Sequence, residues 1–126
     1  MRAMAVVVGL LLPLGMQVPA NAQAHAHYGE RAEKVAKELR CQEFKSYGSG
    51  PFHLDSGVCY LKGSRVNVIT FRSRVQDEQW NARVTADFGP KFYWADGRGA
   101  VVVSRYGSRL AAALGARRLP GTIKHG

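Results

Sequence analysis

The sequence predicts an α+β domain with two layers, in which helices pack on a four-stranded antiparallel sheet. Three observations predict this fold class. Apolar residues at helical spacing open the domain, two pairs of β-forming segments are each joined by a tight turn, and a second helical segment separates the pairs. The predicted order is helix, hairpin, helix, hairpin, with room for a short helix at the C-terminal end.

The N-terminal segment 1–22 is predicted to be a secretory signal peptide. One arginine precedes an uncharged apolar stretch of about 14 residues, which is shorter than the ~20 residues that a membrane span needs. Small residues then form a cleavage site after Ala22, and Ala24 is a second acceptable site. We therefore expect a secreted protein with no stable membrane anchor after cleavage; an uncleaved N-terminal anchor is the alternative.

The rest of the chain is expected to hold one domain with two short flanks. These are a flexible leader at 23–29, the domain itself at 30–116, and a basic frayed tail at 117–126. Cys41 and Cys59 are an even pair in an exported chain, so we expect a disulfide that staples the domain. Closing a loop of this size stabilises the fold by roughly 3 kcal/mol in a chain-entropy estimate.

The first half of the domain is predicted to contain one helix and one hairpin. The buried stripe of the helix is expected to be Ala32, Val35, Ala36 and Leu39. The glycine- and serine-rich segment 42–57 is expected to be an irregular loop. Strands are predicted at 58–62 and 65–72, with the turn at Gly63-Ser64.

The second half repeats this order. A capping box formed by Ser73 and Gln76 begins a helix that Gly89-Pro90 ends. The buried stripe of this helix is expected to be Trp80, Val84 and Phe88. The second hairpin is predicted at 92–95 and 100–104. A short helix at 109–116 would turn one apolar face to the domain, consisting of Leu110, Ala113 and Leu114.

The segment from Arg40 to Ser104 resembles small secreted proteins and lipoproteins of actinobacteria. The resemblance is carried by Gly57-x-Cys59, Gly63-x-Arg65-Val66, Thr70-Phe71, Trp80, Phe88-Gly89 and Val101-Val102-Val103. It implies a location outside the membrane and a fold pattern, and it implies no activity. The chain departs from the lipoprotein members because it lacks their lipobox cysteine and carries a basic C-terminal extension.

Catalytic and metal chemistry find little support in the sequence. It contains no GxSxG, HExxH, P-loop or GxGxxG motif, so we assign no catalytic residue and expect no cofactor. His53, Asp55 and the serines beside them leave a small extracellular hydrolase as the third hypothesis. Cleavage after Ala22 or Ala24 would place His25 or His27 third in the mature chain, where Cu(II) or Ni(II) could bind; an incidental polar leader is the alternative.

Two surfaces are candidates for binding. The loop that the disulfide spans carries Lys45, Tyr47, Phe52 and His53, and loops on a rigid scaffold often carry recognition residues. The alternative is that Tyr47 and Phe52 tuck into the edge of the core. The second surface is basic and would hold polyanions, and its residues are Arg105, Arg109, Arg117, Arg118 and Lys124.

These features favour a secreted, non-enzymatic binding domain that acts outside the membrane on an unknown ligand, which is expected to be an extracellular protein or an anionic envelope polymer. The alternative is a basic module that binds anionic envelope polymers or nucleic acid, since the formal net charge is +9. A further interpretation of this positive charge is that it only keeps the protein in solution. We also expect the fold to survive truncation after Ser104, because the predicted strands and the two main helices lie upstream.

We predict that protein recovered from the medium has lost its first ~22 residues. Signal peptidase acts on the small residues that follow the apolar stretch, so the mature chain should begin at Gln23 or His25. The intact mass of the secreted protein decides this, and a mass equal to that of the full chain would contradict it.

Overall fold

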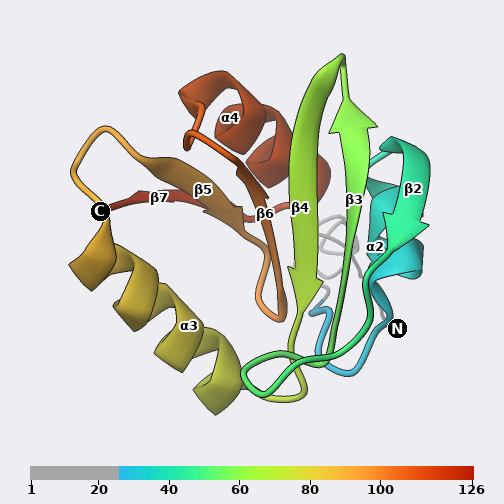
Figure 1. Cartoon of the computed structure of the whole chain (residues 1–126), viewed down its shortest axis with the longest axis horizontal. Helices are drawn as coiled ribbons and strands as arrows, with labels where there is room; N and C mark the ends of the chain where they lie inside the picture. The colour runs from blue at the N-terminus through green and yellow to red at the C-terminus, as the bar shows by residue number, and fades with distance from the viewer. Residues whose placement is uncertain (1–25) are drawn as a thin grey trace, which may run out of the picture.

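The computed structural model describes residues 26–126. The predicted signal peptide, both cleavage sites and His25 therefore lie outside the described residues. The described chain is an α+β domain with three helices and one open antiparallel sheet of six strands, in the order β2-β3-β4-β6-β5-β7 (Figure 1). The expected fold class is confirmed, but the expected count of four strands is wrong. Among residues 26–126, no helix is long and apolar enough to cross a membrane.

Three helices and six strands make up the described chain. The helices are α2 (Ala32–Glu38), α3 (Arg74–Asp87) and α4 (Arg109–Arg118). The strands are β2 (Gln42–Ser46), β3 (Asp55–Leu61), β4 (Ser64–Thr70), β5 (Tyr93–Asp96), β6 (Ala100–Ser104) and β7 (Thr122–His125). Helices cover both faces of the sheet, so the domain has three layers where two were expected: α2 and α4 share one face, and α3 lies on the other (Figure 1).

The face under α2 and α4 holds the larger core. All four residues of the predicted α2 stripe are buried there, together with alternate residues of the strands and the inner side of α4. The strand and helix residues of this core include Cys59, Leu61, Val66, Val68, Ala95, Val102, Ala111 and Leu114. We call this side the α2/α4 face and the opposite side the α3 face.

The disulfide between Cys41 and Cys59 is confirmed, with an S–S distance of 2.02 Å. It joins the residue before β2 to β3 inside the larger core. The backbone N–H of Ala32, at the start of α2, donates to the Asp55 carboxylate of β3 at 2.7 Å. The guanidinium of Arg118 donates to the Leu39 carbonyl at the other end at 2.8 Å. Both ends of α2 are therefore satisfied by distant residues.

The segment 42–57 is not the irregular loop that its composition predicts. Its first five residues form β2, which pairs with β3 across a bulge where Glu43 adopts a left-handed φ of 57°. Phe44 of β2 lies on the backbone of Gly57, where a Cβ would collide with its ring. The turn of the β3–β4 hairpin is formed by Lys62 and Gly63, one residue earlier than expected, because both adopt the positive φ of a type I′ turn.

Helix α3 begins as predicted but buries a different side. Ser73 accepts a hydrogen bond from the backbone N–H of Gln76, and the Gln76 side chain accepts one from the N–H of Arg72. Its buried residues are Asp77, Asn81 and Val84, so of the expected stripe only Val84 is fully buried. Phe88 is 46% exposed and stacks on Phe92 at a centroid distance of 4.1 Å.

The C-terminal region is part of the core rather than a frayed tail. Helix α4 extends to Arg118, and residues 122–125 form β7, which pairs with β5 at the edge of the sheet. The face of α4 is rotated from the expected one, because Leu110 is 85% exposed while its two following alanines are buried. Leu119 is also fully buried in the larger core.

These core contacts reverse the sequence-based expectation for truncation after Ser104. We predict that a chain ending at Ser104 will not fold cooperatively, because it lacks α4 and Leu119 and exposes the apolar surface that they cover. A chain ending at Gly121 is the matched control: it loses only β7, whose four residues are exposed, and Gly126, and it should remain folded. Urea unfolding followed by near-ultraviolet circular dichroism compares the two chains. A cooperative transition in the shorter chain would contradict the assignment of α4 to the core.

Candidate functional site

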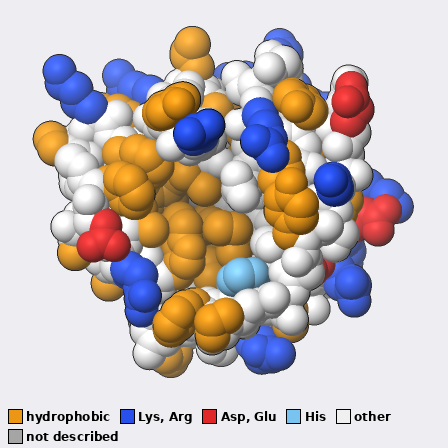
Figure 2. All heavy atoms as spheres, viewed as in Figure 1, with side chains coloured by type: hydrophobic (Ala, Val, Ile, Leu, Met, Phe, Trp, Pro, Cys, Tyr) orange, Lys and Arg blue, Asp and Glu red, His pale blue; other side chains and the backbone are white. Residues whose placement is uncertain are grey.

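A groove on the α3 face is the candidate functional site. It has a volume of about 610 Å³ and lies between α3 and the loop that joins β2 to β3. Figure 2 shows this face as an open hollow with hydrophobic side chains on its floor and a histidine on its rim. Volumes of about 300 to 1,000 Å³ are usual for ligand sites. The lining residues are Phe52, His53, Gln76, Gln79, Trp80, Ala82 and Arg83.

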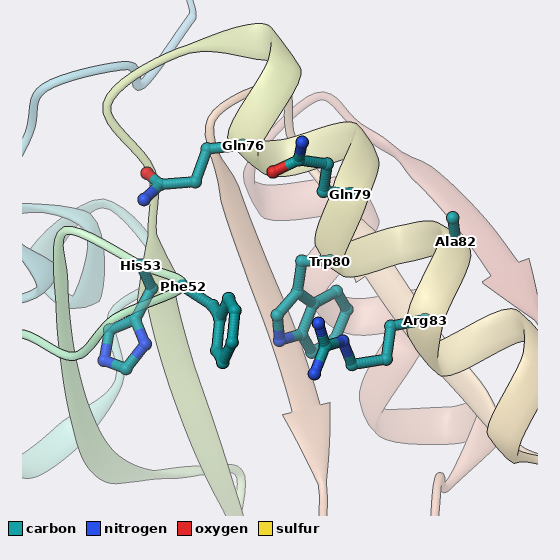
Figure 3. A pocket seen from close by; sticks show the side chains of 7 residues that line it. All are labelled: Phe52, His53, Gln76, Gln79, Trp80, Ala82 and Arg83. Atoms are coloured by element: carbon teal, nitrogen blue, oxygen red, sulfur yellow. The ribbon is translucent and has the colours of Figure 1, made fainter.

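Helix α3 supplies one wall of the groove. Trp80 is half-buried and lies against a smaller core on this face, with centroid distances of 6.1 Å to Phe71 and 6.0 Å to Trp94. Gln76 and Arg83 stand about one turn before and after Trp80 on the same side of the helix, and Gln79 directly precedes Trp80 (Figure 3). The helix therefore presents an anchored aromatic ring flanked by long polar side chains.

The loop between β2 and β3 supplies the opposite wall. Phe52 projects from it toward α3, and the His53 ring lies beside Phe52 against the loop (Figure 3). The loop is held by main-chain hydrogen bonds from Gly48 to Ser56 and from Leu54 to Thr70. Gly50 allows the His53 ring to lie against the loop, because a Cβ there would fall 2.5 Å from the imidazole Cε1. The loop is thus a fixed wall whose aromatic residues are already in place.

Arg83 bridges the two walls. Its guanidinium Cζ lies 4.3 Å from the centroid of the Phe52 ring, within cation–π range. Within the described residues, no carboxylate pairs with Arg83, and none of the residues that line the groove is acidic. Its N–H groups, which lie in the plane of the guanidinium, are therefore available to a ligand.

The uncovered half of the sheet continues this surface beyond the groove. Cys59, Leu61, Val66 and Val68 point to the α2/α4 face, so their strand neighbours point to the α3 face. These neighbours include Tyr60, Arg65 and Asn67, which are exposed. The Arg65 guanidinium donates to the Tyr47 hydroxyl at 3.5 Å, which places Tyr47 on the same surface.

Only part of the predicted binding loop lines the groove. Phe52 and His53 line the groove, and Phe52 is 53% exposed rather than tucked into the core. Lys45 and Tyr47 are also exposed, with the ammonium 5.8 Å from the tyrosine ring, but they line the sheet beside the groove. Sequence reasoning missed Gln76, Gln79 and Arg83, and it assigned Trp80 to the core. A Trp and an Arg three residues apart on an otherwise polar helix were the available signal.

The five predicted polyanion-binding residues do not form one cluster. Arg118 donates to Leu39, and Lys124 lies 3.8 Å from Asp96. Arg109 lies over the ring of Tyr93 at 5.6 Å, and Arg105 lies over that of Tyr106 at 5.3 Å. Arg117 is exposed on α4 and lines a separate, smaller hollow of about 350 Å³.

The side chains considered for a hydrolase serve other purposes. The ring Nε2 of His53 and the hydroxyl of Ser56 both contact the carbonyl of Gly48, at 3.3 and 2.9 Å. Asp55 instead accepts from the N-terminus of α2 on the α2/α4 face. The base, the hydroxyl and the acid are therefore not arranged as a triad, in which the acid must orient the base.

A buried polar network fixes α3 to the sheet, and sequence reasoning missed it as well. The Asn81 amide nitrogen donates to Asp77 at 2.6 Å and to Asp96 at 3.0 Å, and its oxygen accepts from the Trp94 indole at 2.6 Å. The backbone N–H of Gly99 donates to Asp77 at 2.8 Å. Burial, with a smaller contribution from the neighbouring Asp96 charge, raises the pKa of Asp77 to about 6.

A carboxyl group with a raised pKa is a candidate acid or base, but the geometry favours a structural role. Both oxygens of Asp77 accept hydrogen bonds from within the domain, from Asn81 and from Gly99. Those of Asp96 are engaged by Asn81, by Lys124 and by the N–H of Arg98. Every oxygen of the two carboxyl groups therefore already has a partner within the domain.

One cluster in the described part of the chain has donor atoms that could hold a metal ion. His27, Glu30 and Glu38 each place one ligand atom within 4.8 Å of the others. The Nδ1 atom of His27 already lies 2.9 Å from Glu30, whose other oxygen pairs with Lys34 at 3.2 Å. The cluster is explained as a network of hydrogen bonds and a Glu30–Lys34 ion pair that ties the segment before α2 to this helix.

Comparisons with protein-family models, with curated proteins and with solved structures find no match to this chain.

We predict that Asp77 makes stability fall as the pH rises. Its folded pKa of about 6 lies above the value of 3.8 in an unfolded chain, so in this window only the folded state keeps the proton. The difference in unfolding free energy between wild type and Asp77→Asn should fall by about 2 to 3 kcal/mol from about pH 3.5 to about pH 7.

Urea titrations at several pH values measure this difference. Carboxyl groups away from Asp77 titrate in both proteins, so their contributions cancel. Glu30 is one of them: although its burial acts to raise its pKa, hydrogen bonds with His27 and Lys34 lower that pKa overall. A difference that does not change with pH would contradict the prediction.

Proposed function

We propose that this protein is a secreted, non-enzymatic binding domain whose ligand site is the groove between α3 and the β2–β3 loop. The observation that carries the proposal is the Phe52–Arg83 contact, which joins the two walls over the Trp80 side of the groove. Binding sites place a few polar groups around an apolar surface, and this groove has that composition.

The groove is built from fixed parts. Trp80 is packed against two aromatic rings, and the loop is hydrogen-bonded at both ends. A rigid site loses little conformational entropy when a ligand binds, so such rigidity supports recognition. Catalysis would need a nucleophile or a free acid or base in the groove, and among its lining residues only His53 could serve as one.

Secretion is the second part of the proposal. The predicted signal peptide supports it, and so does the disulfide, because disulfides persist in oxidising compartments outside the cytosol. A groove with exposed aromatic residues would then meet its partner at the envelope or in the medium.

A fragment screen tests the proposal. Small aromatic and anionic fragments are added singly to the ¹⁵N-labelled secreted protein, and backbone amide shifts are mapped. We expect the shifts of the binding fragments to cluster at Phe52, Trp80 and Arg83. Fragments that bind only at the hollow beside α4, which Leu110 and Arg117 line, or shifts scattered over the surface would overturn it.

A further inference from the structure

We infer that the groove binds an acidic peptide segment in which a carboxylate side chain stands next to an aromatic or large aliphatic one. This inference rests on the proposed function and names the chemistry of its ligand. The carboxylate would pair with Arg83, and the apolar side chain would lie between Phe52 and Trp80.

The charge of the groove selects an anion. Among residues 26–126, Arg83 is the only formally charged residue that lines it, and its stacking on Phe52 holds the guanidinium in place before a ligand arrives. A guanidinium fork matches a carboxylate with two parallel hydrogen bonds. Arg65 and Lys45, on the sheet beside the groove, extend the positive charge along the open surface.

The remaining polar groups are mostly donors. The carboxamide oxygen of Gln76 already accepts from Arg72, which leaves its NH₂ group for a ligand. The Trp80 indole N–H has no hydrogen-bond partner among residues 26–126, and it can only donate. A ligand rich in acceptors, such as carboxylates and backbone carbonyls, satisfies this set.

The shape of the site favours a peptide over a lipid surface. The apolar side chains lie at the floor of an open hollow (Figure 2), whereas a membrane surface is approached by apolar groups that project. The open side lets a chain enter and leave along the uncovered half of the sheet. An extended peptide also presents side chains on alternate sides, so an acid and an apolar residue can reach different parts of the groove.

Three blocked hexapeptides test the inference against the secreted protein. One alternates glutamate and phenylalanine, one alternates glutamate and serine, and one alternates lysine and phenylalanine. Trp80 reports binding by fluorescence, because Trp94 is fully buried and shielded from the ligand. We expect the first peptide to bind at least about tenfold more tightly than either of the others, and more weakly as salt is added.

Two charge-matched variants locate the site. Arg83→Gln should weaken binding of the first peptide at least about tenfold, the loss expected for one charge-assisted hydrogen bond. Arg109→Gln is the control: it removes an arginine that also stacks on an aromatic ring, Tyr93, but from α4. It should change the affinity less than about twofold. Both arginines are exposed, so neither variant should unfold the domain.

The outcomes separate this inference from the proposed function. If fragments bind in the groove and no acidic peptide does, the inference of a peptide ligand is wrong and the proposal that the groove is a binding site stands. Equal loss in both arginine variants would overturn the role of Arg83. If anionic phospholipid vesicles bind in a manner that depends on Arg83 and the first peptide does not bind, the ligand is a lipid headgroup and the peptide inference is wrong.

Discussion

The amide of Asn81 is the contact on which the architecture of the α3 face depends. Helix α3 has only one fully buried apolar residue, so hydrophobic packing alone does not fix its position. Asn81 instead links the helix to Trp94 and Asp96 of β5, and Asp77, one turn earlier, reaches the N–H of Gly99 in the β5–β6 turn. These bonds are directional, unlike apolar contacts, and a buried donor or acceptor left without its partner costs about 1 to 3 kcal/mol. The network therefore ties α3 to β5 and the β5–β6 turn in one register.

The groove follows from that restraint. Because α3 is held over β5 and β6, its far side stands beside β4 without covering it, and Ile69 of β4 is packed only at the edge of the smaller core. The strands still alternate, so apolar and aromatic side chains point from β3 and β4 toward this uncovered side. The β2–β3 loop closes the remaining edge, and the disulfide ties the start of β2 to β3. The proposed ligand surface is thus the part of the sheet that α3 leaves uncovered, because this helix is held over β5 and β6.

The elements that sequence patterns predicted well are those whose signals are local. The α2 stripe, the capping box at Ser73 and the second hairpin all depend on residues within a few positions of one another.

The errors share a different cause. Strand β2 forms because β3 offers a partner, despite the glycines that follow it, and β7 forms because β5 has a free edge. The buried side of α3 was misassigned because Asp77 and Asn81 are polar, and only distant partners make their burial favourable. Only half of the candidate site was predicted, for the same reason. Phe52 and His53 were identified from the composition of the loop, whereas the role of Arg83 depends on its contact with Phe52, which is distant in the sequence.

Two of the arginine–aromatic contacts in the described residues show why geometry, rather than charge, singles out the groove. Arg109 lies over Tyr93 and Arg83 over Phe52, so the two guanidinium groups have similar local surroundings. Only Arg83 stands at the edge of a hollow with a second aromatic ring, Trp80, among its lining residues, where an apolar group can be removed from water while its neighbouring charge is paired. Net charge draws anions to every basic surface of this protein alike. Selection among those anions requires the apolar contact as well, and in the groove the two contacts lie within reach of one ligand.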